Sequence, residues 1–247
     1  MPCHLQINMQ QDILPYITDC KTAHKKLLAL LLDPAKVIIN DLHKIIRSIE
    51  NNADFIFVGG STVADGDTQK LVIELKKISN LPVILFPGDH TQIAEDADAI
   101  LFLSLLSGNN PEYLIGQQLK SVPKLRMSEL EIIPTGYILI DGTTKTSVQT
   151  VSNTKPIPNN NIELAVNTAV AGKFLGKKMI YLEAGSGAQN SVPLEMIKEV
   201  SENIDIPLIV GGGIRTKEQL ENTYKNGADI VVIGTAFEEN THFFDII

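Results

Sequence analysis

Several features that would assign this 247-residue sequence to a class are scarce or missing. It contains two cysteines, too few for a disulfide framework, and we expect Cys3 and Cys20 to be reduced thiols in a cytoplasmic protein. No apolar run reaches the roughly 18 residues that a membrane span requires, and the N-terminus lacks the basic-then-apolar pattern of a signal peptide. The sequence therefore predicts no integral membrane segment.

Basic charge is also in short supply, with 21 Lys and Arg residues against 29 Asp and Glu, for a formal net charge of −8. We expect no nucleic-acid partner for a chain with this balance. The balance does not exclude an anionic small molecule, because backbone dipoles or a metal ion can bind it locally. The hydrophobic content of 44% is ordinary for a globular protein and excludes a disordered, collagen-like or coiled-coil chain.

Common catalytic motifs are absent as well. No HExxH or CxxC pattern suggests zinc, and no GxGxxG pattern suggests a Rossmann dinucleotide site. Gly185-Ser186-Gly187 lacks the first glycine of a GxSxG nucleophile elbow. His90 follows a predicted strand and could enter a site, although a structural or solvent-exposed role is more common for a lone histidine.

What the sequence does contain is an alternation of short apolar runs and amphipathic stretches. The runs are typical of parallel strands buried on both faces, and they cover residues 27–32, 55–58, 83–86, 100–106, 138–140, 179–182, 208–210 and 230–233. Apolar residues at helical spacing predict helices over residues 37–51, 67–79, 110–126, 162–175, 192–202 and 217–226.

Eight strands with intervening helices predict an α/β fold, a TIM (β/α)8 barrel, as a single domain over residues 1–247. The alternative is an open doubly wound sheet. Residues 1–26 precede the first strand, and we expect a short helix there that closes the barrel bottom. Only residues 92–97 separate two strands, so the third helical unit is expected to be short or replaced. The polar loop over residues 141–160 is long enough to be functional, often as a lid.

In such a barrel the loops at the carboxyl ends of the strands carry the chemistry. Asp33 directly follows the first strand, where a carboxylate is a natural ligand for Mg²⁺, or alternatively a cap for the next helix. After the second strand, Gly59 and Gly60 let the backbone approach a ligand, and Ser61 offers a hydroxyl to a metal or phosphate.

Three later loops predict an acid–base group and a phosphate site. Glu183 ends the sixth strand, where a carboxylate can accept a proton from a substrate hydroxyl or hydrogen-bond it. The backbone amides of the following residues, 185–187, suit an anion. The seventh and eighth strands end in residues 211–213 and 234–235, where barrels commonly bind a phosphate group.

Five motifs occur in one order over about residues 28–240: LLDPAK, FVGGST, YLEAGSGA, VGGGIR and VIGTA. In this set and order the sequence resembles the geranylgeranylglyceryl phosphate synthase family, which includes the bacterial heptaprenylglyceryl phosphate synthases. The stretch TGYILIDGTTKTSVQTVS resembles the second group of that family. The resemblance implies a TIM barrel with a modified third unit, in agreement with the short 92–97 segment.

The resemblance also implies a Mg²⁺-dependent prenyltransferase. Such an enzyme forms an ether bond between the 3-hydroxyl of sn-glycerol 1-phosphate and a polyprenyl diphosphate, here expected to be geranylgeranyl diphosphate, and releases diphosphate. It implies Asp33 and Ser61 as metal ligands. As catalytic residues we expect Glu183, which would hydrogen-bond the acceptor hydroxyl or accept its proton, and Tyr181, which would help to position it. The substrate-binding residues that it implies are Tyr181, Leu182, Glu183, Ala184, Gly185, Ser186, Gly187, Gly212, Gly213, Gly234 and Thr235. One departure is the lack of a basic residue immediately before Asp33, for which Lys36 could substitute.

The residues alone leave other functions open. Another phosphate-binding barrel enzyme, such as a sugar-phosphate isomerase, synthase or lyase, would share the late glycine loops but would need no apolar trench. Candidates to line a trench, or simply to pack in the core, are Leu101, Leu103, Leu105 and Leu106. A flavin barrel lacks a visible isoalloxazine partner, and a non-catalytic phosphometabolite-binding barrel would not need carboxylates at two strand ends. From the family we expect a homo-oligomer.

Overall fold

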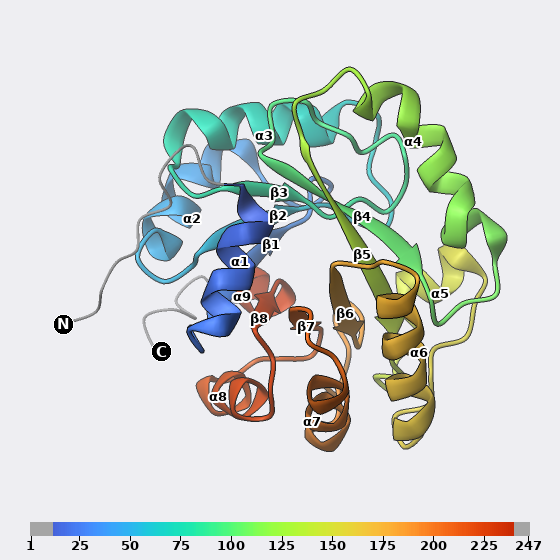
Figure 1. Cartoon of the computed structure of the whole chain (residues 1–247). Coiled ribbons are helices and arrows are strands. Elements are labelled where there is room, and N and C mark those ends of the chain that lie inside the picture. The colour runs from blue at the N-terminus through green and yellow to red at the C-terminus, as the bar shows by residue number, and fades with distance from the viewer. Residues whose placement is uncertain (1–11, 240–247) are drawn as a thin grey trace.

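The computed structural model describes residues 12–239, which form a closed barrel of eight parallel strands (Figure 1). The strands are β1 (Leu27–Leu32), β2 (Phe55–Val58), β3 (Val83–Leu85), β4 (Ala99–Leu105), β5 (Glu131–Leu139), β6 (Met179–Glu183), β7 (Leu208–Gly211) and β8 (Ile230–Ile233). Each strand pairs with its neighbour in sequence, and β1 pairs with β8 to close the ring. The predicted TIM barrel is confirmed, and the open doubly wound sheet is wrong.

The predicted helices are present with small changes of boundary. They are α1 (Ile13–Thr22), α2 (Leu42–Ile49), α3 (Asp67–Ile78), α4 (Gln117–Leu125), α6 (Ile162–Phe174), α7 (Leu194–Asn203) and α8 (Lys217–Lys225). A 3-10 turn η1 (Ile39–Asp41) precedes α2, and a π-helical turn η2 (Glu112–Gly116) runs into α4. Two short helices were not predicted: α5 (Ser147–Ser152), inside the long polar loop, and α9 (Thr235–Glu239).

The third unit departs from the barrel pattern, as predicted, because only turns connect β3 to β4. The seam between these two strands is also short, with Cα partners only at Ile84–Ala99 and Leu85–Ile100. By contrast, β4 and β5 stay paired from Ala99 to Leu105. The barrel wall is therefore least covered where β3 and β4 meet.

Strand β5 is much longer than the predicted run of residues 138–140. Pro134 and Gly136 interrupt its apolar pattern, and this hid its first half from sequence reasoning. Gly136 has a packing reason to lack a side chain, because an added Cβ would lie within 2.9 Å of methyl groups of Leu106 and Ile180. The wall between β4 and β6 thus packs tightly against the barrel's outer layer.

The core has two layers that follow the alternation of side chains along the strands. One layer fills the barrel interior and includes Phe55, Phe57, Tyr137 and Tyr181. The other lies between the strands and the surrounding helices and includes residues from α2, α3 and α7. Buried runs on both faces explain why most strands read as unalternated apolar segments.

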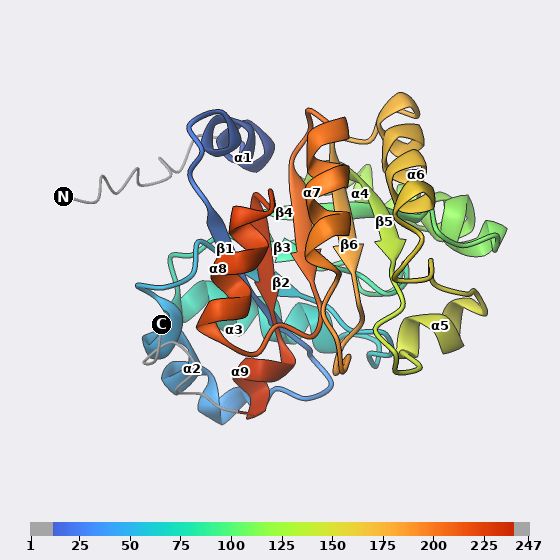
Figure 2. The same cartoon turned by 90° about the horizontal axis from the view of Figure 1, so that it is seen from below.

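Helix α1 closes the amino-terminal end of the barrel, opposite α5 and α9 (Figure 2). Ile17 of α1 is fully buried and packs in the barrel interior layer. The carboxylate of Glu131, at the start of β5, accepts hydrogen bonds from the amides of Ile13 and Leu14, the latter at 2.9 Å. At the other end of the helix, Lys21 Nζ lies 2.8 Å from Asp229 Oδ2. The helix predicted to close the barrel bottom is thus confirmed over residues 13–22; residues 1–11 lie outside the described part of the chain.

Candidate functional site

A cavity of about 390 Å³ opens at the carboxyl ends of the strands, on the side of the barrel away from α1. Two parts of it differ in chemistry. The part that we call the glycine end is lined by Ser186, Gly187, Gly212, Gly213, Gly234 and Thr235. The part that we call the apolar arm is lined by Ile93, Ile100, Phe102, Leu103, Val148 and Val151. One cavity therefore joins a region suited to an anion with a region suited to an apolar chain.

Glu183 lines the same cavity and is 5% exposed. Its Oε1 atom accepts a hydrogen bond of 2.7 Å from the amide of Gly185. Burial raises the pKa of this carboxyl above its ordinary value, while the neighbouring Tyr181 hydroxyl and the Gly185 amide act in the opposite direction. A buried carboxyl group with a raised pKa is suited to exchanging a proton with a bound hydroxyl.

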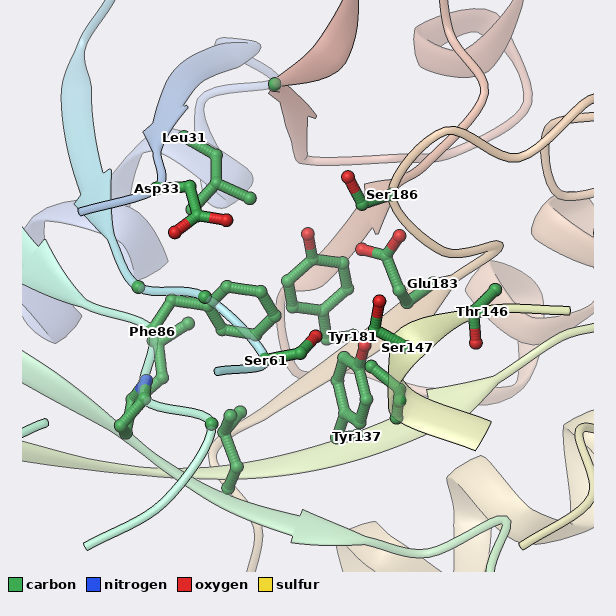
Figure 3. Close-up of a pocket in the computed structure, with 18 of the residues that line it drawn as sticks. Leu31, Asp33, Ser61, Phe86, Tyr137, Thr146, Ser147, Tyr181, Glu183 and Ser186 are labelled. Atoms are coloured by element: carbon green, nitrogen blue, oxygen red, sulfur yellow. The ribbon is translucent and has the colours of Figure 1, made fainter. Parts of the chain in front are cut away.

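Three aromatic rings form the floor of the cavity beside Glu183 (Figure 3). The ring of Tyr181 stacks on Phe86 at a centroid distance of 5.1 Å and meets Tyr137 edge-on at 5.4 Å. The two tyrosines are directly paired in the register of β5 and β6. The Tyr181 hydroxyl is buried beside the Glu183 carboxylate, but within residues 12–239 it makes no hydrogen bond of standard geometry, so a bound polar group could satisfy it.

Two glycines of the β7 loop make room for this carboxylate and hydroxyl. A Cβ added to Gly211 would lie 2.5 Å from the Tyr181 hydroxyl oxygen and 2.8 Å from Glu183 Oε2. A Cβ on Gly212 would lie 2.5 Å from Glu183 Oε1, and this residue has a φ of +83°. Larger residues would therefore displace the two reactive side chains.

The glycine end is also held together across loops. Ser186 Oγ lies 3.1 Å from Thr235 Oγ1, which links the loop after β6 to the start of α9. Exposed backbone amides in such loops are good ligands for a phosphate group.

Asp33 and Ser61 reach the same cavity from the loops after β1 and β2 (Figure 3). Asp33 Oδ1 accepts the amide of Ala35 at 3.0 Å, and a Cβ on Gly60 would lie 2.4 Å from the same oxygen. Residues 12–239 contain no cluster of three or more His, Cys, Asp or Glu side chains that could hold a metal. Asp33 supplies one carboxylate to this cavity and Ser61 one hydroxyl, a ligand type and number that fit Mg²⁺, which commonly takes its remaining ligands from substrate phosphates and water.

The apolar arm passes from the barrel interior to its outside. Leu103 faces the interior layer, whereas Ile93 and Ile100 belong to the layer between strands and helices. Helix α4 and the turn before it close the far side with Tyr113, Gln118 and Ser121. This passage exists because no helix covers the short β3–β4 seam.

Most of the predicted site residues come together in this cavity: Asp33, Ser61, Tyr181, Glu183, Ser186, Gly187, Gly212, Gly213, Gly234 and Thr235. The side chains of Leu182 and Ala184 instead pack in the outer core layer, so only their backbone is near the site. Gly185 acts through its amide. Of the candidate trench leucines, Leu101, Leu103 and Leu105 line the cavity, whereas Leu106 packs in the outer layer.

Sequence reasoning missed Tyr137 and the residues of α5. The truncated prediction of β5 began one residue after Tyr137, although the strand's period-2 pattern would have placed this residue beside Tyr181. The sequence Thr-Ser-Val-Gln at residues 146–149 carries a capping-box signal for α5, with Gln149 three residues after Thr146. His90, considered above, lines the cavity, and its Nδ1 lies 2.9 Å from Gln117 Oε1.

Together, the barrel, the buried carboxylate and the joined anion and apolar regions define a TIM-barrel enzyme for one anionic and one elongated apolar reactant. The chain belongs to the PcrB family, whose model matches residues 21–247.

Two similar proteins carry the same name. The chain is 51% identical over 242 residues to the geranylgeranylglyceryl phosphate synthase of Flavobacterium johnsoniae, covering 96% of this chain and all of that protein. It is 46% identical over 224 residues to the protein of the same name from Thermococcus kodakarensis, covering 89% and 87% of the two chains.

Two solved structures are also similar to this chain, to different degrees. The crystal structure of (S)-3-O-geranylgeranylglyceryl phosphate synthase from Thermoplasma acidophilum, in complex with the substrate sn-glycerol-1-phosphate, matches with a TM-score of 0.89. It is 32% identical, and the match covers 96% of this chain and 95% of that one. Orotidine 5′-monophosphate decarboxylase from Methanocaldococcus jannaschii, at 18% identity and a TM-score of 0.58, shares the fold alone.

Proposed function

We propose that this chain joins the 3-hydroxyl of sn-glycerol 1-phosphate to a polyprenyl diphosphate, preferably geranylgeranyl diphosphate, in an ether bond. The observation that carries the proposal is a single cavity lined by the glycine end, the apolar arm and Glu183. Sugar-phosphate isomerases and lyases would use the first region but have no need of the second. The similarity to a protein with sn-glycerol-1-phosphate bound supports the choice of acceptor.

The acceptor binds with its phosphate on the amides of the glycine end. Held there, the three-carbon chain directs its free hydroxyl toward Glu183 and the unpaired hydroxyl of Tyr181. Tyr181 completes its hydrogen bonding with the acceptor and positions it. Glu183 takes the proton of the attacking hydroxyl, and its raised pKa makes it a better base than an exposed glutamate.

The donor binds with its hydrocarbon in the apolar arm and its diphosphate near Asp33. The acceptor oxygen forms a bond to C1 of the donor as the bond from C1 to the diphosphate oxygen breaks. The diphosphate leaves with the electron pair, and the proton of the hydroxyl stays on Glu183. The cationic side chains of Lys36 and Arg215 line the cavity and contribute positive charge.

Asp33 and Ser61 would hold Mg²⁺ at the donor's diphosphate. When bound, the ion supplies positive charge that neutralises the leaving group. Lys36 Nζ lies 3.9 Å from Asp33 Oδ2, so one lysine is placed to assist at the same position.

Two further expectations belong to this proposal. A cytoplasmic location is part of the proposal. As a separate finding, no helix in the described part of the chain is both long and apolar enough to cross a bilayer. We also propose that copies of the chain associate. The exposed side chains of Ile115, Leu119 and Val122, spaced along one face of η2 and α4, are the apolar surface that supports this.

The test is an incubation of the protein with Mg²⁺, radiolabelled sn-glycerol 1-phosphate and prenyl diphosphates of several lengths. We expect a labelled, lipid-extractable product, with most from geranylgeranyl diphosphate. Excess EDTA should abolish the product, and added Mg²⁺ should restore it. Two results would contradict the proposal: no extractable label with any donor, or turnover of glycerol phosphate without a donor.

A further inference from the structure

Thr146 occupies a junction between the two parts of the cavity. It is the N-cap of α5 and is 5% exposed. Its Oγ1 accepts the amide of Gln149 at 3.2 Å, and its own amide donates to Gln149 Oε1 at 2.6 Å. Because a helix of six residues is marginal by itself, α5 depends on this reciprocal cap and on its packing.

The methyl group of Thr146 packs directly on the loop of the glycine end. A Cβ added to Gly185 would lie 2.1 Å from Thr146 Cγ2, so these two residues are in close contact. Gly185 has a φ of +103°, and its amide is the group that binds Glu183 Oε1. In Figure 3 Thr146 projects from the α5 side toward the loop that follows Glu183.

The rest of α5 forms a wall of the apolar arm. Val148 and Val151 both line the cavity, and Val148 also packs against the barrel interior layer. Beyond them, the carbonyl of Ser152 accepts a hydrogen bond of 2.7 Å from Asn110 Nδ2, which ties the end of α5 to the segment before α4. The helix therefore spans from the glycine end to the donor region.

We infer that Thr146 is a positioning residue that couples the two substrate regions, so that a phosphomonoester at the glycine end strengthens donor binding in the apolar arm, and the reverse. The inference rests on the proposed function. A phosphomonoester bound to the backbone amides of the Gly185 loop restrains the surface against which the Thr146 methyl packs, and through this contact it restrains α5, the wall of the apolar arm. Linkage requires the same factor in both directions.

The experiment measures dissociation constants by calorimetry for sn-glycerol 1-phosphate and for geranylgeranyl thiolodiphosphate, an unreactive donor analogue. Each ligand is titrated alone and with the other at saturation. For the unchanged protein we expect each to bind at least about five-fold more tightly when the other is present, within the usual range of coupling between sites. Thr146→Ser keeps the capping hydroxyl and removes only the methyl, and it should reduce this factor to below about two.

A matched control is Thr150→Ser, which removes a methyl from the exposed side of the same helix and should keep the full factor. If Thr146 had only a structural role, Thr146→Ser would lower the melting temperature. For each ligand, the ratio of the dissociation constant measured alone to that measured with the other ligand at saturation would then stay unchanged. The inference is overturned if both ligands bind the unchanged protein independently, or if Thr146→Ser retains the full factor. Failure of either ligand to bind the unchanged protein would instead contradict the proposed function, and the inference with it.

Discussion

Glu183 Oε1 and the amide of Gly185 are joined by a 2.7 Å hydrogen bond within one turn of chain. This bond commits one carboxylate oxygen to the backbone. The other oxygen, Oε2, faces Gly211, where the lack of a side chain leaves the space beside it open. A short loop thus fixes the direction of the proposed base before any substrate binds.

Glu183→Gln should reduce turnover by about 10²- to 10⁴-fold, the usual contribution of a general base. The amide oxygen of glutamine can still accept the Gly185 hydrogen bond, so the fold should be kept. The measurement is the rate of lipid-extractable product, with circular dichroism as the control for folding. Turnover within a factor of two of the unchanged enzyme would rule out the base role.

The raised pKa of Glu183 has consequences for pH dependence. Activity should fall as the pH drops through a value above that of an ordinary glutamate, because the base becomes protonated. For stability the sign is opposite: a raised folded-state pKa favours the protonated form, so stability is lost as the pH rises through it. The Glu183→Gln variant should therefore have a higher melting temperature than the unchanged protein. The difference between the two melting temperatures should be larger at pH 8 than at pH 5. An equal difference at both values would contradict this.

Tyr181→Phe should separate binding from folding. The hydroxyl is buried and, in the described part of the chain, makes no hydrogen bond of standard geometry, so its removal should leave the melting temperature unchanged or raise it. If the hydroxyl positions the acceptor, kcat/KM for sn-glycerol 1-phosphate should fall by about 10- to 100-fold. Steady-state kinetics at varied acceptor and saturating donor concentrations measure this. An unchanged kcat/KM would rule out the role of the Tyr181 hydroxyl in positioning the acceptor.

Two glycines in equivalent loops should respond differently to alanine. Gly211→Ala places a methyl group 2.5 Å from the Tyr181 hydroxyl oxygen, and such overpacking costs about 1–3 kcal/mol of unfolding free energy. In Gly234→Ala the nearest atom lies at 3.6 Å, an ordinary contact, so the stability should hardly change. Thermal melts of the two variants provide the comparison. Equal melting temperatures would contradict the prediction, since they would mean that the backbone at Gly211 shifts to accommodate the methyl group without loss of stability.

Glu131→Ala should destabilise the protein without touching the site. It removes the acceptor for the amides of Ile13 and Leu14, and the loss of such a helix cap costs about 1 kcal/mol. Because α1 lies at the opposite end of the barrel, kcat of the folded enzyme should be retained (Figure 2). Glu131→Gln keeps one acceptor oxygen and replaces the other with an amide NH2 that cannot accept, so it should be intermediate in melting temperature. If kcat of Glu131→Ala were lower even well below its melting temperature, the prediction would be wrong, and contacts at the α1 end of the barrel would affect the site at the other end.

The sequence predicted the residues that sit directly at strand ends, because the boundary of an apolar run and a following polar or glycine residue are both visible in one segment. Asp33 and Glu183 are such cases. Tyr137 was missed because Pro134 and Gly136 broke the apolar run of β5, and only the register with β6 reveals its partner. Of the two roles predicted for Leu106, the structure shows core packing; the sequence left both open because the direction of this side chain depends on where β4 ends. The contact of Thr146 with Gly185 joins residues from different loops and has no local signature.

The short seam between β3 and β4 has a consequence for how this kind of barrel can diversify. Chemistry at the acceptor depends on β6 to β8, whereas the space for the second reactant is bounded by the turns after β3 and by α4. Insertions or substitutions in those two segments can reshape one compartment while the proton-transfer geometry stays untouched. Tolerance for differently sized hydrocarbons and conservation of the ether-forming step can therefore evolve as separate traits.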